Sequence, residues 1–167
     1  AAMYGRLRRH YQFVNEAHLF AEVHNLTRYS VNIYGQRRIQ PAFEQLANLF
    51  VPSSVDASYA HDGSGEVGGY KNEAGKWNFA GHADRIVAVD AAMLATFARL
   101  YDEPGTPPMQ ARLPALHAGA LASALRKLAT WPRRLADLGA EYFSTVMFDE
   151  TYSQRDGTLT RRALGDN

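Results

Sequence analysis

The chain has 167 residues, 46% of them hydrophobic, which suits one globular domain with an ordinary core and is too short for two large ones. It contains no cysteine, so disulfide bonds and thiolate metal sites are excluded. No apolar stretch approaches the roughly 18 residues of a membrane-spanning helix, and the N-terminal AAMYGRLRRH lacks the apolar core of a secretory signal. These features predict a cytoplasmic protein.

The net charge of +1 is distributed unevenly along the chain. Residues 1–40 carry six arginines and two glutamates, a net charge of +4, and residues 111–167 carry a net charge of +2. Residues 41–110 carry four basic and nine acidic residues, a net charge of −5. Arginine clusters neutralise nucleic-acid phosphates and release counterions, but arginines also keep strand and helix surfaces hydrated. Charge alone therefore permits a DNA partner without requiring one.

Two stretches near the N-terminus alternate apolar and polar residues with the period of a β-strand. In Leu7–Phe13 the apolar residues fall at 7, 11 and 13, and in Tyr29–Tyr34 they fall at 29, 31 and 33. Successive side chains of a strand point to opposite faces of a sheet, so both stretches predict strands with one buried face. A hairpin of two strands is not stable alone in water, so this one must rest on further strands or on a helix.

Residues 41–84 are predicted to form a short helix and a long glycine-rich loop. The helix is predicted over Pro41–Phe50, because proline suits a first helical turn and apolar residues recur at 43, 46, 47 and 50. From Ser53 to Gly81 the composition shifts to Gly, Ser, Asp and Asn, with at most a small hairpin around Gly75. Loops of this length are uncommon inside a compact domain and are often functional.

Residues 85–148 are predicted to be mainly helical. A brief strand, Arg85–Val89, precedes Asp90, which is placed to cap a helix over Ala91–Tyr101. A second helix is predicted from about Ala118 to Thr130, and a third begins at Pro132. The residues expected on buried faces are Met93, Leu94, Phe97, Leu100 and Tyr101 in the first helix, Leu121, Ala124, Leu125 and Leu128 in the second, and Trp131, Leu135, Leu138, Tyr142 and Val146 in the third.

The sequence thus predicts an α+β fold in four segments. They are a β-hairpin in residues 1–40, a short helix and glycine-rich loop in 41–84, a helical region in 85–148, and a polar basic tail in 149–167.

Two motifs in the glycine-rich loop point only weakly to chemistry. Gly63–Gly68 matches the letters of a dinucleotide-binding GxGxxG loop, but it has neither the preceding strand nor the following helix that such a loop needs. His61-Asp62 and His82-Ala83-Asp84 bracket it with residue types that bind divalent ions, yet their spacing does not fix a common site. No metal site, cofactor site or catalytic residue is therefore predicted.

Phe20 is the strongest candidate for contact with a ligand. It lies between the two predicted strands, in a loop that also holds Asn15, His24 and Thr27. A ring in such a loop either tucks beneath the hairpin or offers a flat face to a nucleic-acid base. Stacking of a base on an aromatic ring is worth about 1–3 kcal/mol.

Three short motifs in residues 7–35 resemble a known enzyme family. Phe13-Val14-Asn15-Glu16, Leu19-Phe20 and Tyr29-Ser30-Val31-Asn32-Ile33-Tyr34-Gly35 are similar to the sixth and seventh strands of the large adenine-specific DNA methyltransferases of restriction-modification and phage-defence systems. The rest of the chain is similar only loosely. The resemblance implies that Phe20, or Tyr29 in its place, stacks on the flipped-out adenine, and that the parent enzyme uses S-adenosylmethionine as methyl donor.

The chain departs from this family where the chemistry would occur. Its only Pro-Pro pair, Pro107-Pro108, lies in Thr-Pro-Pro-Met and not in the catalytic Asn-Pro-Pro-Tyr, and no glycine-rich cofactor loop follows a strand. We therefore expect a fragment downstream of the catalytic loop that binds no S-adenosylmethionine and does not methylate DNA by itself. Its expected partners are DNA and the rest of the methyltransferase chain. The residues expected to contact DNA are His24, Arg28, Arg37, Arg38, Arg155 and Arg161.

A second hypothesis assigns the chain no enzymatic role. In it, the hairpin and helices form a stand-alone interaction module that presents the acidic residues 41–110 as a loop to another protein. Binding to DNA that weakens steeply with salt would favour the methyltransferase hypothesis over this one.

Overall fold

The computed structural model describes residues 3–141 and 150–160 of the chain. They belong to two compact units, Ala1–Trp131 and Pro132–Asn167, each of which is described by itself. Within the described residues, no helix combines the length and the apolar character needed to span a membrane.

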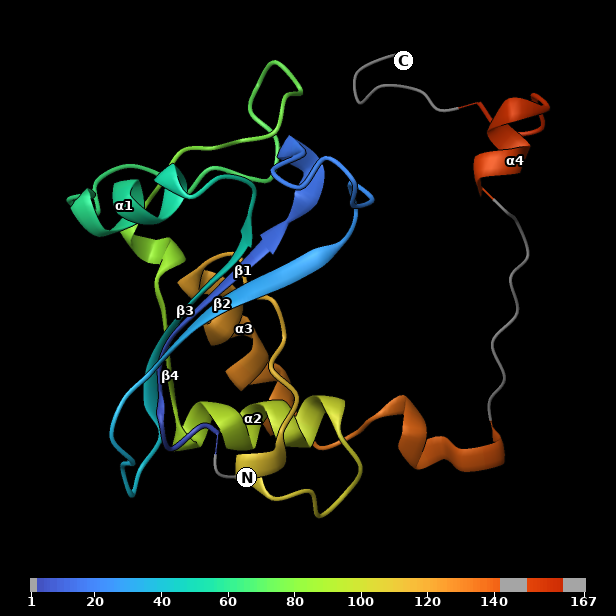
Figure 1. Ribbon diagram of the computed structural model, residues 1–167. Helices are drawn as coiled ribbons and strands as arrows, with labels where there is room; N and C mark the ends of the chain where they lie inside the picture. The colour runs from blue at the N-terminus through green and yellow to red at the C-terminus, as the bar shows by residue number, and fades with distance from the viewer. Residues whose placement is uncertain (1–2, 142–149, 161–167) are drawn as a thin grey trace. The chain divides into compact units, whose positions relative to one another are not determined.

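The larger unit is built on a four-stranded mixed sheet with the strand order β2-β1-β3-β4 (Figure 1). The strands are β1 (Leu7–Val14), β2 (Arg28–Tyr34), β3 (Ala42–Leu49) and β4 (Val87–Asp90). β1 pairs antiparallel with β2 and parallel with β3, and β3 pairs antiparallel with β4. The predicted N-terminal hairpin and the α+β class are confirmed, and the short strand predicted over Arg85–Val89 is present as Val87–Asp90.

Three α-helices of this unit flank the sheet: α1 (Ser53–Ala60), α2 (Ala91–Tyr101) and α3 (Gly119–Thr130). Short 3₁₀ helices occur at Asn15–Ala17, Ala83–Arg85 and Pro108–Gln110. The predicted helices over α2 and α3 are confirmed. So is the predicted cap, because Asp90 Oδ1 accepts a hydrogen bond of 2.7 Å from the backbone N–H of Met93.

Strand β3 shows that the helix predicted over Pro41–Phe50 is wrong. β3 lies inside the sheet and an apolar cluster covers each of its faces, so residues on both faces are buried and the simple two-residue alternation is lost. The left-handed backbone of Asn48, with φ of 56°, adds a bulge where the register with β1 shifts. A strand that is buried on both faces and contains a bulge has apolar residues at spacings much like those of a helix.

Helix α1 shows that the loop predicted over Ser53–Gly81 begins too early. Two buried serines tie this helix to the returning chain, because Ser54 Oγ donates to Phe79 O at 2.7 Å and Ser58 Oγ accepts from His82 N at 3.3 Å. Gly81 lies so close that a Cβ there would approach Ser58 N to 2.3 Å. The predicted small hairpin around Gly75 is confirmed by the bridge between Lys71 and Trp77.

Apolar side chains form two clusters, one on each face of the sheet. The larger cluster joins the sheet to α2 and α3, and its buried members include Leu7, Phe43, Val89, Met93 and Phe97. The smaller cluster consists of buried Tyr11, Phe13, Leu46 and Leu49 with partly buried Tyr29, Val55 and Ile86 around it. The larger cluster therefore forms the main core, and the smaller one is the floor of an incompletely covered face.

Helix α3 buries a different face from the one predicted. The predicted core residues Leu121, Ala124 and Leu128 are exposed, whereas Ala122 and Ala129 are buried. These alanines lie seven residues apart, two helical turns, and their small side chains suit a close approach between helices. The prediction for α2 is wrong at Tyr101, which is exposed, and correct at Met93, Leu94 and Phe97.

A buried arginine holds the end of β3 against the chain that leads into β4. Arg85 is 3% exposed and donates to the carbonyls of Ala47 and Asn48 at 3.1 Å and of Ala80 at 3.2 Å. Desolvation by this burial lowers the pKa of Arg85. These three carbonyls accept the hydrogen bonds of Arg85, which thereby holds the bulge at Asn48. Among the described residues, no salt bridge joins Arg85 to a carboxylate.

The smaller unit departs from the third helix and the tail that were predicted. Its described residues contain a 3₁₀ segment, Leu135–Glu141, interrupted at Gly139, and a short helix α4 (Glu150–Arg155) where a polar tail was expected. Leu138, which was predicted to be buried, is exposed, and so is Trp131 at the end of the larger unit. The predicted core residues Tyr142 and Val146 lie outside the described residues.

Candidate functional site

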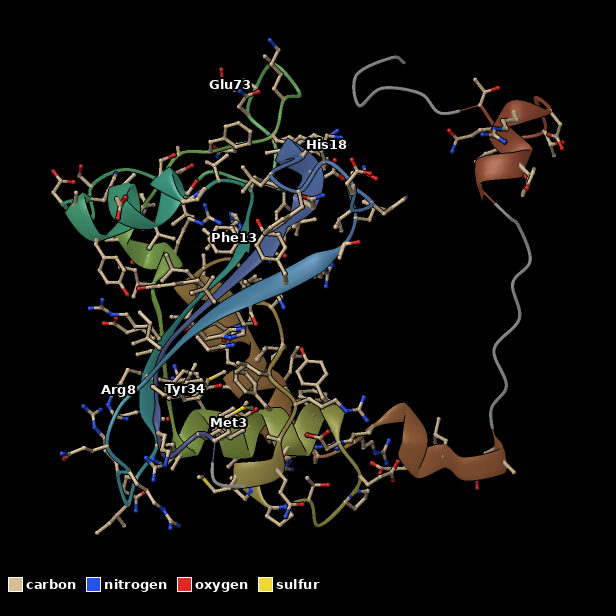
Figure 2. All side chains as sticks on the ribbon, viewed as in Figure 1. Met3, Arg8, Phe13, His18, Tyr34 and Glu73 are labelled. Carbon is tan, nitrogen blue, oxygen red and sulfur yellow. The ribbon has the colours of Figure 1, made fainter. Side chains whose placement is uncertain are left out.

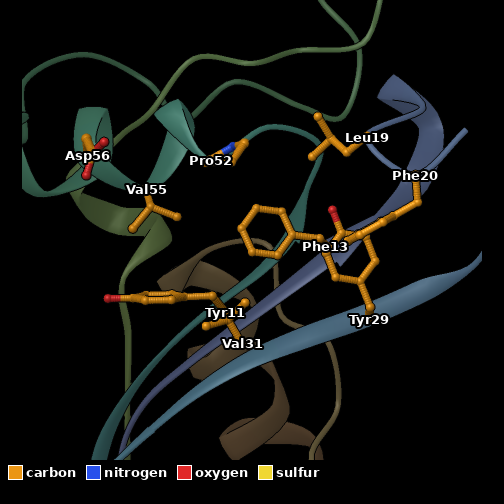
Figure 3. A pocket seen from close by; sticks show the side chains of 9 residues that line it. All are labelled: Tyr11, Phe13, Leu19, Phe20, Tyr29, Val31, Pro52, Val55 and Asp56. Carbon is orange, nitrogen blue, oxygen red and sulfur yellow. The ribbon is translucent and has the colours of Figure 1, made fainter.

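An open apolar groove of about 390 Å³ lies between the hairpin loop and the start of α1 (Figure 3). It is lined by Tyr11, Phe13, Leu19, Phe20, Tyr29, Val31, Pro52, Val55 and Asp56. β1 and β2 supply the floor, because Phe13 pairs with Tyr29 and Tyr11 with Val31 on the same face of the sheet. Pro52 and Val55 form the opposite wall. The groove is thus the part of the smaller apolar cluster that α1 leaves uncovered.

Phe20 and Tyr29, the two residues predicted to stack on a base, are brought together at this groove. Their ring centroids are 5.0 Å apart with the planes at 86°, an edge-to-face contact. Tyr29 also stacks on Phe13, with centroids 5.4 Å apart and planes at 11°. Phe20 nevertheless remains 52% exposed. It is therefore neither tucked fully beneath the hairpin nor free of the protein.

Asn15 holds the loop that carries Phe20. Its side chain is fully buried, accepts from Phe20 N at 3.0 Å, and donates to Phe20 O at 2.9 Å and to Val23 O at 2.8 Å. Its backbone N–H donates to Thr27 O at 3.0 Å and so closes the base of the loop. Sequence reasoning did not assign this role. An asparagine immediately after a strand was the available signal, because asparagine commonly bonds the backbone of its own loop.

The polar groups of the groove are few. Burial raises the pKa of Tyr29, so its phenol stays protonated near neutral pH and is available as a hydrogen-bond donor. Asp56 is exposed at the rim, on α1. The groove combines flat apolar walls, the carboxylate of Asp56 and the phenols of Tyr11 and Tyr29, and the Tyr11 hydroxyl already donates to the Tyr59 hydroxyl at 3.3 Å. This set of groups can hold an aromatic ring, but it offers no activated nucleophile.

The predicted DNA-contacting residues of the hairpin do not converge on the groove. Arg28 precedes Tyr29 in β2, so its side chain points to the opposite face, where it lines a hollow with Glu16 and Trp77. His24 is exposed, and its Nδ1 accepts from Leu26 N at 3.2 Å within the loop.

Arg37 and Arg38 follow the far end of β2, about 20 Å from its start at roughly 3.3 Å per residue. Figure 2 shows the two ends, with Arg8 and Tyr34 at one and Phe13 and His18 at the other. A single nucleotide in the groove therefore does not reach these arginines.

The two remaining predicted DNA contacts belong to the smaller unit. Arg155 lies with its guanidinium 5.9 Å from the ring centroid of Tyr152. Arg161 lies outside the described residues. Their predicted contact with DNA stays a prediction.

The loop after α1 brings two histidines together without forming a metal cluster. The rings of His61 and His82 are 4.2 Å apart, and His82 Nδ1 accepts from Asp84 N at 3.0 Å. His61 Nδ1 accepts from Gly63 N at 3.0 Å. Both Nδ1 atoms are thus occupied by the loop backbone. Among the described residues, no three His, Asp or Glu side chains are grouped closely enough to hold a metal ion.

The relation of the chain to known proteins was tested in three ways, by family models, by curated proteins and by solved structures. None of the three comparisons finds a match to this chain.

Proposed function

We propose that this chain is a piece of an S-adenosylmethionine-dependent, adenine-specific DNA methyltransferase, in which it contacts the target base and carries no catalytic residue. The observation that supports the proposal best is Phe20. Its ring is half-exposed beside an apolar groove and rests edge-on against Tyr29, and its backbone N–H and C=O are both hydrogen-bonded to the Asn15 side chain. A fixed ring with an open face is what stacking on a flipped-out base requires.

The size and chemistry of the groove agree with a nucleobase as ligand. Its volume of about 390 Å³ falls within the range of roughly 300–1,000 Å³ typical of small-molecule pockets. The Tyr29 phenol and the Asp56 carboxylate supply one donor and one acceptor for the polar edge of a base. The predicted phosphate contacts at Arg37 and Arg38 would then serve DNA that extends beyond the groove.

The Gly63–Gly68 loop does not support a cofactor role for this chain, because it follows α1 instead of a strand and no helix begins directly after it. The same segment argues against the interaction-module hypothesis in the form of an acidic loop, because residues 41–110 contain β3, α1, β4 and α2. The methyl donor would have to bind elsewhere in the parent enzyme, and this chain alone is expected not to methylate DNA.

Binding to an extrahelical adenine tests the proposal. The probe is a fluorescent duplex with one adenine opposite an abasic site, because such a base leaves the stack at little cost. Phe20→Ala should raise the Kd of the chain for this duplex by about five- to a hundredfold, the equivalent of about 1–3 kcal/mol of lost stacking. In the parent enzyme the same change should slow methylation and leave cofactor affinity intact.

Leu19→Ala is the matched control, because Leu19 lines the same groove and is similarly exposed but has no aromatic face. It should change the Kd less than about threefold, which is under about 0.7 kcal/mol. Equal Kd values for wild type and Phe20→Ala, with both proteins folded by circular dichroism, would remove the proposal. So would the absence of DNA binding at any salt concentration together with recovery of a protein partner by pull-down.

A further inference from the structure

Strand β2 is an edge of the sheet and is paired on one side only. Its neighbour is β1, and the strand order places no other described strand beyond it. Six of its seven residues are exposed and Tyr29 is half-buried. Val31 is 52% exposed and Ile33 is 42% exposed, so apolar side chains of this edge are left open to solvent.

The register identifies which backbone groups of β2 face outward. Asn15 N donates to Thr27 O and Gly35 N donates to Arg6 O, so Thr27 and Gly35 belong to hydrogen-bonded pairs at the two ends of the ladder. In an antiparallel ladder these pairs alternate with pairs that are not bonded. The backbone N–H and C=O groups of Arg28, Ser30, Asn32 and Tyr34 therefore point away from β1.

This edge lacks the features that protect exposed edges in other proteins. From Tyr29 to Gln36 the chain has no charged residue and no proline, whereas natural edge strands usually carry lysine, proline or an inward charge. The other edge, β4, is only four residues long. The uncharged part of β2 after Arg28 is therefore a template for another strand.

We propose that the free edge of β2 binds an extended polypeptide segment as a fifth strand of the sheet. The outward N–H and C=O groups recur at every second residue, a spacing that only another β-strand backbone matches along its length. On the groove side the segment meets Val31 and Ile33, and on the opposite face it meets Ser30 and Asn32. The segment therefore alternates apolar and polar residues. This inference does not depend on the proposed function.

The arginines on either side of the uncharged stretch indicate which residues the ends of the bound segment should carry. Arg28 lies at one end of the uncharged stretch, and Arg37 and Arg38 lie just beyond the other. Acidic residues at both ends of the segment are complementary to these arginines. A second copy of β2 is not complementary, because antiparallel pairing centred on Val31 places Arg28 of one copy within three residues of Arg37 of the other.

A peptide-binding experiment with the whole chain tests the proposal. The probe is a fluorescent peptide of about nine residues that alternates valine and threonine between two terminal glutamates. We expect saturable binding with a Kd at least tenfold lower than that of the same peptide with terminal lysines. The protein variant is Ser30→Pro, which removes an outward N–H and leaves the ladder with β1 intact. It should weaken binding at least tenfold, and Ser30→Thr should not.

Two further measurements keep the proposal falsifiable if Ser30→Pro fails to fold. A peptide N-methylated at alternate residues cannot donate along one edge, so it should lose affinity for the unmodified chain at least tenfold. Sedimentation equilibrium reports any pairing of β2 with itself. The proposal would be overturned if the N-methylated and unmodified peptides bound with equal affinity, or if peptides with terminal glutamates and terminal lysines did. A dimer of the chain that Ser30→Pro dissociates would also overturn it. Phe20 lies outside β2 and supplies no backbone group to its edge, so failure here is distinguishable from failure of the base-stacking proposal.

Discussion

At the scale of single residues, buried polar side chains organise the loops of this protein. Asn15 fixes the hairpin loop through three hydrogen bonds, and Arg85 fixes the bulge of β3 through three carbonyls. Unpaired polar groups are costly inside a protein, so each residue holds its loop in one conformation. The candidate groove depends on Asn15 as much as on the aromatic rings that line it.

His117 is expected to make the stability of the folded protein depend on pH. It lies before α3 with its ring 4.6 Å from that of Tyr70, and its Nε2 contacts Gly68 O at 2.8 Å. Burial, and to a smaller extent the charge of Arg85, lower the pKa of His117. The folded protein therefore resists a proton that the unfolded chain accepts at about pH 6.5. Below that pH the unfolded state binds more protons, so the free energy of unfolding should fall as the pH falls.

Urea denaturation of wild type and His117→Gln between about pH 8 and pH 5 measures this effect. The variant should lose less stability on acidification than the wild type does. His24→Gln is the matched control, a histidine-to-glutamine change at an exposed position of the hairpin loop. Parallel pH profiles for wild type and His117→Gln would contradict the role given to His117.

At the scale of elements, the sequence predicts those whose pattern has a single period. β1 and β2 alternate along one face, and α2 has both a cap and a buried stripe, so local patterns identify all three. β3 was predicted as a helix because apolar clusters on both sides of the sheet bury both of its faces, which a local pattern does not reveal. α1 was missed because its sequence SSVDASYA holds few apolar residues and is fixed by buried serines.

The cap of α2 gives a prediction at this scale. Asp90 ends β4 and accepts from Met93 N, so it joins a strand to the helix that carries much of the main core. Asp90→Ala should lower the free energy of unfolding by about 1 kcal/mol, the usual cost of losing such a cap. Chemical denaturation measures the change. Asp90→Asn should be almost neutral because asparagine caps about as well, and equal losses for the two variants would show that the cap contributes little.

At the scale of the whole molecule, the sequence indicated two members of the candidate groove, Phe20 and Tyr29, but neither their arrangement nor the rest of the lining. Phe20 and Tyr29 were chosen as alternatives for one role, and the fold places them in contact. Arg28, predicted to contact DNA, points to the other face of the sheet. Pro52 and Val55 line the groove because the start of α1 lies beside it, and the sequence did not predict α1. Sequence separation hides such neighbours because the strand order and helix packing that join them are not local properties.

Both apolar clusters lie within residues 1–131, so this part of the chain should fold without residues 132–167. A chain ending at Trp131 is expected to show one cooperative unfolding transition and an ordered near-UV circular dichroism spectrum. A chain ending at His117 is the control. It lacks α3, whose Ala122 and Leu125 pack in the main core, and it should lose cooperativity. A molten spectrum for the longer chain would show that the core requires residues beyond Trp131, because lost near-UV signal reports lost side-chain packing.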